Sequence, residues 1–332
     1  MLDVVTCGEA MALFAAQETG SLEHCSHYAR MTAGAELNVA IGLARLGHRV
    51  GYLSRLGDDS LGRFLLEALD RERIDRSHVA IDPACPTGLM FKTRNDDGSD
   101  PQVEYFRRGS AASRLSLADF DAEWCLRARH LHLTGISAAI SASACELTIH
   151  LAREGRRAGR IVSFDPNLRP RLWASQSAMI EQINALAALS DIVLPGLEEG
   201  RLLTGHTTPE AIAEFYLERG AAIVVVKLGP LGAYYASSGR EVHRTKLQGC
   251  GTVDAMPVDR VVDTVGAGDG FAVGVISGLL DGLPLAQAVG RATVIGARVV
   301  QFAGDSEGLP TREELENGVG QHASIHDARM PD

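Results

Sequence analysis

Short apolar runs alternate with segments of helical spacing along most of the chain. Runs typical of buried strands occupy residues 160–165, 191–194 and 221–228. Apolar residues recur with a helical period in segments 37–44, 145–158, 176–188, 209–219, 268–281 and 284–302. This alternation predicts an α/β fold, in which helices cover both faces of a mainly parallel sheet.

Two regions interrupt the alternation, at residues 10–32 and 87–108. The second holds two strand-like runs around the turn-forming residues 95–98, so strands outside the main sheet are expected. The predicted organisation is a main α/β domain, a small β domain and a polar tail. The main domain takes residues 1–9, 33–86 and 109–310, the small one 10–32 and 87–108, and the tail 311–332.

The helix predicted from residue 268 follows a glycine-rich turn, and segment 260–262 before the turn has the pattern of a strand end. The first N–H groups of a helix lack backbone partners and lie at the positive end of its dipole. The N–H groups of Gly266, Ala267 and Gly268 are therefore expected to bind a phosphate-like anion. The alternative, a plain glycine turn, is weaker in this strand, turn and helix context.

Asp269 follows this turn directly. A carboxylate beside an anion site suits a general base that takes a hydroxyl proton. The surrounding N–H groups are expected to keep it ionised. Its alternative role is a helix N-cap, which aspartate fills well, and both roles can hold at once.

Composition narrows the range of partners. The chain has 332 residues, 45% apolar side chains and a formal net charge of −10. Without basic runs, this charge argues against nucleic acid or an anionic membrane surface. The six cysteines show no metal or disulfide spacing, and no segment is long enough to span a bilayer, so a soluble cytoplasmic protein is expected.

The run Asp-Thr-Val-Gly-Ala-Gly-Asp, which ends at Asp269, resembles the signature of the ribokinase-like carbohydrate kinases. The resemblance implies a three-layer α/β/α domain with a small β-sheet lid that closes over the sugar and often forms a dimer contact. It implies ATP and Mg²⁺ and allows a monovalent cation. In this family the Gly-Ala-Gly amides bind the transferring phosphoryl group, and the last aspartate is the catalytic base.

Lys227 ends an apolar run and begins the motif Lys-x-Gly-x-x-Gly. By itself, such a residue is a strand-end lysine that reaches solvent. By resemblance, Lys227, Gly229 and Gly232 bind ATP. The same resemblance assigns Asn167, in Asp-Pro-Asn-Leu-Arg, to the nucleotide.

A second glycine-bearing helix start lies at Gly34 and Ala35, followed by Asn38. In the family this segment approaches the sugar and the asparagine contacts hydroxyls. A helix cap followed by a core residue is the alternative. The family's usual first glycine is Ala33 here, where a positive φ would be strained.

Tyr105 and Arg107, followed by Gly-Ser-Ala-Ala-Ser, resemble the 2-keto-3-deoxygluconate kinases within this family. There the lid tyrosine, the lid arginine and the arginine that corresponds to Arg169 hold the sugar acid. The planar guanidinium fork suits a carboxylate, which a neutral hexose lacks. Asp305 is a further candidate for sugar hydroxyls, or a turn residue.

Glu199 stands where the family has the glutamate of an Asn-x-x-Glu element that organises Mg²⁺, but Gly196 replaces the asparagine. Indirect metal binding is therefore the most that this segment implies. His130 and His132 lie two apart on a predicted strand, as zinc ligands sometimes do. No carboxylate or cysteine nearby in the sequence completes such a site, and a core or edge strand is favoured.

The predicted function is ATP-dependent phosphorylation of 2-dehydro-3-deoxy-D-gluconate at its terminal hydroxyl, in sugar-acid catabolism of the Entner–Doudoroff type. The substrate follows from the resemblance, as does a homo-oligomer formed through the lid. The alternatives are a fructokinase or other neutral-sugar kinase and, more distantly, a nucleotide-binding regulator without catalysis. A Rossmann dehydrogenase is disfavoured because no Gly-x-Gly-x-x-Gly opens the first helix.

Overall fold

The computed structural model describes residues 1–95, 100–243, 245–246 and 249–317. In this part of the chain the largest sheet has nine strands, and only β12 runs antiparallel to the other eight. Their order across the sheet is β15 (Cys250–Val253), β12 (Ala233–Ser237), β11 (Ile223–Lys227), β10 (Ile192–Val193), β9 (Ile161–Asp165), β8 (His130–Thr134), β1 (Val4–Cys7), β4 (Val50–Gly57) and β5 (Val79–Asp82).

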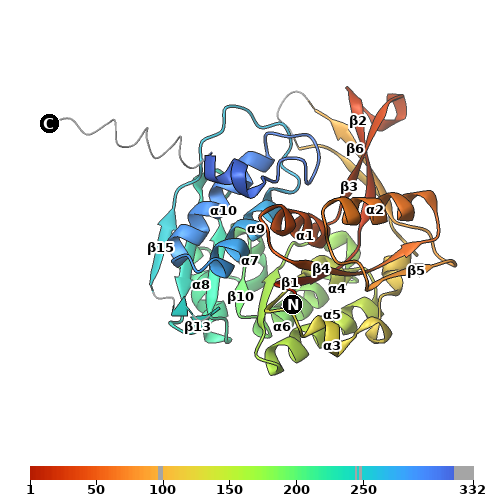
Figure 1. The fold of residues 1–332 in the computed structure, drawn as a ribbon. Coiled ribbons are helices and arrows are strands. Elements are labelled where there is room, and N and C mark those ends of the chain that lie inside the picture. The colour runs from red at the N-terminus through yellow and green to blue at the C-terminus, as the bar shows by residue number, and fades with distance from the viewer. Residues whose placement is uncertain (96–99, 244, 247–248, 318–332) are drawn as a thin grey trace.

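Helices cover both faces of this sheet, which confirms the predicted three layers (Figure 1). Neighbouring strand residues face opposite layers, so Val4 joins one apolar core and Val5 the other. The first core contains residues of α1 (Ala35–Arg45), α2 (Ser60–Arg71), α9 (Ala267–Leu280) and α10 (Leu285–Val299). The second contains residues of α3 (Ala122–Cys125), α4 (Gly135–Ala139), α5 (Ala142–Arg157), α6 (Gln176–Ala188), α7 (Leu197–Thr204) and α8 (Pro209–Glu218).

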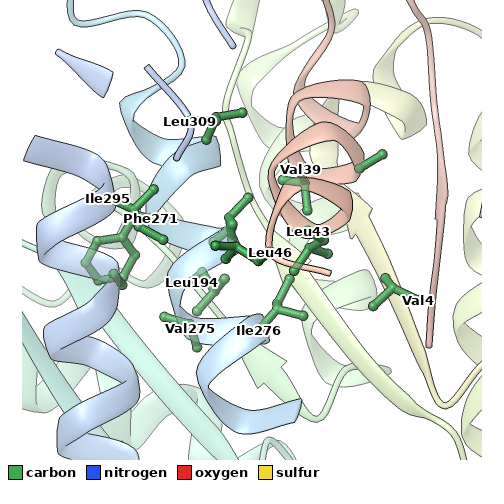
Figure 2. Packing of buried hydrophobic residues seen from close by; sticks show 14 of the residues in the cluster. Val4, Val39, Leu43, Leu46, Leu194, Phe271, Val275, Ile276, Ile295 and Leu309 are labelled. Atoms are coloured by element: carbon green, nitrogen blue, oxygen red, sulfur yellow. The ribbon is translucent and has the colours of Figure 1, made fainter. Parts of the chain in front are cut away.

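Helix α9 is apolar on all sides because it lies inside the first core. Figure 2 shows Val275 and Ile276 of α9 in the same cluster as Leu43 of α1. Its glycines also allow close packing against α10: a Cβ atom on Gly274 would lie 2.2 Å from the Cα of Ala292. Because α9 is packed inside the first core, its first turn is held in a fixed position.

The two interrupting regions form one mixed sheet, which is called the small sheet below. Its order is β3 (Tyr28–Ala33), β2 (Met11–Thr19), β6 (Leu89–Arg94) and β7 (Val103–Phe106). Strands β2 and β6, one from each region, pair in parallel. The small sheet projects from the layered body (Figure 1). Strands outside the main sheet are thus confirmed, while most of the expected turn at 95–98 lies outside the described residues.

Shorter elements complete the fold. A two-stranded ribbon joins β13 (Glu241–Val242) to β14 (Thr245–Lys246). The 3-10 helices are η1 (Leu22–His24), η2 (Ala111–Arg114), η3 (Leu117–Asp119), η4 (Pro170–Leu172) and η5 (Gly229–Leu231). None of the helices in the described part of the chain is long and apolar enough to cross a membrane.

Two expectations near the carboxyl end differ from the structure. Segment 260–262 belongs to no strand; instead, Val262 and Asp263 donate their N–H groups to the carbonyl of Val300, at 2.7 and 3.2 Å. That carbonyl follows α10, where helix carbonyls lack internal partners, so the bond replaces a strand ladder. Residues 312–317 of the expected tail are helical, and Leu315 is buried in the first core.

Candidate active site

A cavity of about 280 Å³ opens at the carboxyl ends of β9 and β11, between the start of α9 and the small sheet. Parallel α/β sheets bind ligands at this edge. Most of the predicted site residues line it: Gly34, Ala35, Asn38, Tyr105, Arg107, Asn167, Arg169, Glu199, Lys227, Gly266, Gly268, Asp269 and Asp305. The structure thus gathers residues that are more than 200 positions apart in the sequence.

Three predicted residues do not line this cavity: Ala267, Gly229 and Gly232. Ala267 donates its N–H to the carbonyl of Thr264 at 3.3 Å, within the turn. Gly229 and Gly232 lie in the turn after β11, with φ of 59° and 96°. A positive φ favours glycine at both positions, and neither residue lines the cavity.

Helix α9 points its amino end at the cavity. Gly266 is the N-cap, with φ of 84°. A Cβ atom there would lie 2.4 Å from the carbonyl oxygen of Asp305, so only glycine allows this approach. Gly266 and Gly268 both line the cavity, which places the positive end of the helix dipole at its wall.

Asp269 lies in the first turn of α9 and is buried, with 8% of its surface exposed. Its Oδ2 accepts a 2.8 Å hydrogen bond from Nδ2 of Asn38, and its Oδ1 accepts one of 3.3 Å from Asn167. It does not cap the helix, since Gly266 holds that position without any side-chain bond. The capping alternative is therefore wrong.

Burial raises the pKa of Asp269 to about 7, and the charges of Asp165 and Asp305 add to the effect. The hydrogen bond from Asn38 acts in the opposite direction. Near neutral pH the carboxylate is therefore only partly ionised, because loss of water outweighs the nearby amides that were expected to keep it charged. A base with a pKa near the working pH is well suited to proton transfer.

Lys227 does not extend into solvent as a lone strand-end lysine would, because its side chain is only 18% exposed. Its Nζ lies 2.7 Å from Oδ2 of Asp165 at the end of β9. A Cβ atom on Gly268 would lie 3.6 Å from the same Nζ, so the ammonium is beside the start of α9. Burial opposes the charge, but Asp165 and Glu199 outweigh it and raise the pKa of Lys227.

Asp165 was not predicted as a site residue. The available signal was its position, since an acid that ends an apolar strand lies at the ligand edge of a parallel sheet. Glu9 was missed for a similar reason: it follows Gly8 just beyond the end of β1 and is 2% exposed. Both carboxylates line the cavity.

Arg107 faces Glu9. Its Nη2 lies 2.5 Å from Oε2 of Glu9. The other carboxylate oxygen of Glu9, Oε1, accepts a hydrogen bond from the hydroxyl of Ser110. Tyr105 lines the same wall and is 44% exposed. Arg169 donates to the carbonyl of Leu168 at 2.9 Å. In this structure Arg107 therefore has a protein carboxylate as its partner.

The start of α1 accounts for the departure at Ala33. Ala33 ends β3, and the positive φ, 135°, falls on Gly34 instead. A Cβ atom on Gly34 would lie 2.3 Å from the carbonyl oxygen of Glu9, so a side chain there would clash. The expected strain at Ala33 is therefore absent, and Asn38 one turn later is directed at Asp269.

Glu199 is a backbone-organising residue in this structure. Its two carboxylate oxygens accept 2.7 Å hydrogen bonds from the N–H groups of Leu168 and Gly196. Within the described residues, no group of three or more His, Cys, Asp and Glu side chains could hold a metal ion. His130 and His132 share the hydroxyl of Ser163 at 2.7 and 2.8 Å, which supports setting them aside as a zinc pair.

Asp305 lines the cavity and is 4% exposed. Its Oδ1 accepts a 2.8 Å hydrogen bond from Nζ of Lys92, a small-sheet residue that the sequence did not single out. Lys92 also contacts Asp263, at 2.5 Å. A carboxylate of this kind is more than a turn residue, because a buried ammonium fixes it.

Comparison with known proteins agrees with this geometry. Residues 1–312 match the pfkB family carbohydrate kinases. The chain is 50% identical to a 2-dehydro-3-deoxygluconokinase of Bacillus subtilis (strain 168) over 326 residues, 98% of each chain. A PfkB protein from Polaromonas sp. JS666 has a similar structure, with a TM-score of 0.86, 54% identity and coverage of 95% and 99%.

A putative ribokinase II from E. coli, solved in complex with ATP and Mg²⁺, has a TM-score of 0.87 at 26% identity and covers 97% of this chain and 100% of its own. The two chains therefore share the same overall fold. The similarity extends over nearly the whole described chain. The chain therefore belongs to the pfkB family of carbohydrate kinases.

Proposed function

We propose that this enzyme transfers the terminal phosphoryl group of ATP to 2-dehydro-3-deoxy-D-gluconate, forming the 6-phosphate. The observation that carries the proposal is a single cavity with Asp269 and the start of α9 at one end and Arg107 and Arg169 in its lining. The 50% identity to the Bacillus subtilis 2-dehydro-3-deoxygluconokinase supports the substrate.

In the proposed reaction, the ionised form of Asp269 accepts the proton of the terminal hydroxyl as that oxygen attacks phosphorus. Asn38 and Asn167 orient the carboxylate through their amide groups. The N–H groups at the start of α9 and the ammonium of Lys227 stabilise negative charge on the transferring group. Catalysis then rests on position and charge, which is what phosphoryl transfer requires.

The residues fit ATP and Mg²⁺ in part. Gly266, Gly268, Lys227 and Asn167 offer donors and positive charge for phosphates. Mg²⁺ would neutralise charge on the phosphates, held mainly by them and by water, since Glu199 is occupied by backbone amides. Glu199 supports this region indirectly by fixing the backbone at Leu168 and Gly196.

At the acid end, Arg107 and Arg169 bind the substrate carboxylate, and Tyr105 contacts the sugar chain. Gly34, Ala35, Asn38 and Asp305 serve the hydroxyl groups. The planar guanidinium of Arg107 matches a carboxylate in two parallel hydrogen bonds. When the substrate binds, its carboxylate then either replaces the carboxylate of Glu9 as the partner of Arg107 or binds Arg107 together with Glu9.

The small sheet, with residues 10–32 and 87–108, acts as a lid over the 1–9, 33–86 and 109–310 domain and excludes water during transfer. Its edge strand β7 exposes Phe106 at 56%, which supports a homo-oligomer formed through this sheet. The enzyme acts in the cytoplasm, in keeping with six free cysteines.

A neutral-sugar kinase is the second candidate, and one observation favours it. Glu9 already neutralises Arg107, so the cavity does not present an unpaired guanidinium. If this pair stays closed around substrate, a hydroxyl of fructose could bind there instead. A non-catalytic regulator has less support, because Asp269 retains a base environment.

The test is release of ADP by the full chain with ATP and Mg²⁺, comparing 2-dehydro-3-deoxy-D-gluconate, fructose, ribose and gluconate at equal concentrations. The proposal expects kcat/KM for the keto acid to exceed that for every neutral sugar by at least about 10²-fold, the scale of two charge-assisted hydrogen bonds. Preference for fructose would overturn the substrate and retain the kinase. No ADP with any sugar would favour the regulator.

A further inference from the structure

Lys92 is a buried charge that the proposed reaction does not use. It lies on β6 of the small sheet, and its side chain is 3% exposed. Its Nζ contacts Oδ2 of Asp263 at 2.5 Å and Oδ1 of Asp305 at 2.8 Å. An ammonium is placed so deeply only with partners, because an unpaired buried charge is strongly unfavourable.

The two carboxylates bring this charge to the reacting end of the cavity. Asp263 begins the loop before α9, and its Oδ1 accepts a 2.9 Å hydrogen bond from the N–H of Val265. Asp305 lines the cavity, and its carbonyl oxygen packs against Gly266, where an added Cβ atom would lie at 2.4 Å. Lys92 therefore holds both sides of the turn that precedes Asp269.

The neighbouring carboxylates favour the charged form of Lys92. Burial works against the ammonium, but the carboxylates of Asp305 and Asp263 more than offset it and raise the pKa of Lys92. Burial raises the pKa of Asp305, and the charge of Lys92 acts in the opposite direction. With all three groups ionised, one positive and two negative charges leave the cluster with a net charge of −1 beside the turn that precedes α9. Without Lys92, two uncompensated carboxylates would face each other and repel phosphate.

We propose that Lys92 is a positioning residue for phosphoryl transfer: its ammonium is the internal counter-ion that ties the small sheet to the 263–268 loop and to Asp305. The inference rests on the proposed kinase reaction for its effect on turnover. Its structural part, the ordering of the loop by a small-sheet lysine, stands apart from the identity of the sugar. Lys92 does not line the cavity, and its ion pairs are with Asp263 and Asp305, so it acts through these two partners.

The experiment compares wild type, Lys92→Met, Lys92→Ala and the control Arg94→Met, which removes a positive charge from an exposed position on the same strand. Each is assayed with the sugar that wild type uses best. We expect Lys92→Met to lower kcat by at least about tenfold, since a misplaced loop lowers effective concentration of the reacting groups. KM for the sugar should change less, and Arg94→Met should behave as wild type.

Chemical rescue distinguishes the role of the Lys92 charge in turnover from a general contribution of Lys92 to stability. Methylammonium should restore part of kcat in Lys92→Ala, where the side chain leaves room, and should not raise kcat in wild type or Arg94→Met. A merely structural lysine would show no such rescue. Lack of rescue together with kcat within about twofold of wild type would overturn the proposal.

Hydrogen exchange of peptides covering 261–270 provides a readout without turnover. Exchange there should be at least about tenfold faster in Lys92→Met, with the peptides of α5 and α6 unchanged. Equal exchange in the loop, or faster exchange throughout the protein, would overturn the proposal. If wild type phosphorylates no sugar, the kinase proposal fails while this measurement still decides the role of Lys92.

Should Lys92→Met not fold, the double variant Lys92→Met with Asp263→Asn keeps the cluster at a net charge of −1. It removes the ionic link but leaves an amide oxygen able to accept from Val265. The proposal expects this variant to fold and still to show the lower kcat and the faster loop exchange. Wild-type values for both in the double variant would overturn it.

Discussion

Nδ2 of Asn38, on α1, donates a 2.8 Å hydrogen bond to Oδ2 of Asp269, on α9. The bond joins residues 231 positions apart and favours the ionised carboxylate, while burial favours the neutral one. Burial prevails, and the pKa of Asp269 is raised to about 7. The balance between one amide and one buried acid therefore sets the pH at which the proposed base works.

The pH profile of wild type should reflect this balance. Only the ionised carboxylate can accept a proton, so kcat/KM should fall tenfold per unit as the pH drops below about 7. ADP release at saturating ATP, measured from acid to alkaline pH, checks this. A flat profile down to the ordinary aspartate value of 3.8 would show that Asp269 is not the group that titrates.

Removing the amide should move the profile. In Asn38→Ala the carboxylate loses a charge-assisted hydrogen bond, so its pKa should rise by about one unit and the acidic limb should shift upward with it. At pH well above the limb, kcat should recover most of the way. An unmoved limb would mean that Asn38 does not tune Asp269.

The Asp269→Asn variant should lose the proposed general base while keeping a side chain of nearly the same shape. Turnover should fall by at least about 10²-fold, while ATP binding, followed by calorimetry, stays close to wild type. The pKa of Asp269 is about 7 in the folded protein and 3.8 in the unfolded chain. The free energy of unfolding of wild type therefore falls as the pH rises between these two values. The variant should therefore melt above wild type at alkaline pH, with a smaller gap in acid.

Arg107→Met tests the acid end of the cavity, and its neighbour Arg108→Met is the control, because Arg108 is exposed. Loss of Arg107 should lower kcat/KM for the keto acid by at least about 10²-fold and for fructose far less. It also leaves Glu9 buried without its ion pair, so melting curves must accompany the assay. Equal losses on both sugars would assign Arg107 to packing rather than to specificity.

Two glycines of the packed helices provide a matched pair for stability. A Cβ atom on Gly274 of α9 would lie 2.2 Å from Ala292, whereas one on Gly290 of α10 meets nothing within 4 Å. Gly274→Ala should therefore cost about 2 kcal/mol or more through overpacking. Gly290→Ala should gain up to about 1 kcal/mol from helix propensity. Urea unfolding measures both.

Much of this architecture could be predicted because its signals are local. Helical spacing gave α6 at 176–188 with both ends correct, and the glycine turn gave the start of α9 within one residue. The strand expected at 260–262 was wrong because an extended apolar segment looks the same whether it pairs with a strand or with the end of α10. Local pattern does not reveal the partner.

The site was predicted where a motif supported it and missed where only the fold creates it. Asp165 ends β9 within the Asp-Pro-Asn-Leu-Arg motif, and Glu9 lies beyond β1 without a motif. In neither case does the local sequence reveal the partner, so their contacts with Lys227 and Arg107 are visible only in three dimensions. The state of Asp269 was also beyond the sequence, because its pKa depends on burial by distant segments. The family resemblance suggests a role for each residue of a motif, whereas the structure shows which residues each of them contacts.

The order in which the chain is synthesised gives the Lys92 cluster a further meaning. The small sheet is complete at Phe106, long before the ribosome reaches Asp263 and Asp305. Before Asp263 and Asp305 have been synthesised, burying the ammonium of Lys92 is unfavourable because it would lose its hydration without gaining a partner. This cost opposes packing of the small sheet against the rest of the protein. The contacts that join Lys92 to Asp263 and Asp305 can therefore form only after both acids have been synthesised, near the end of translation.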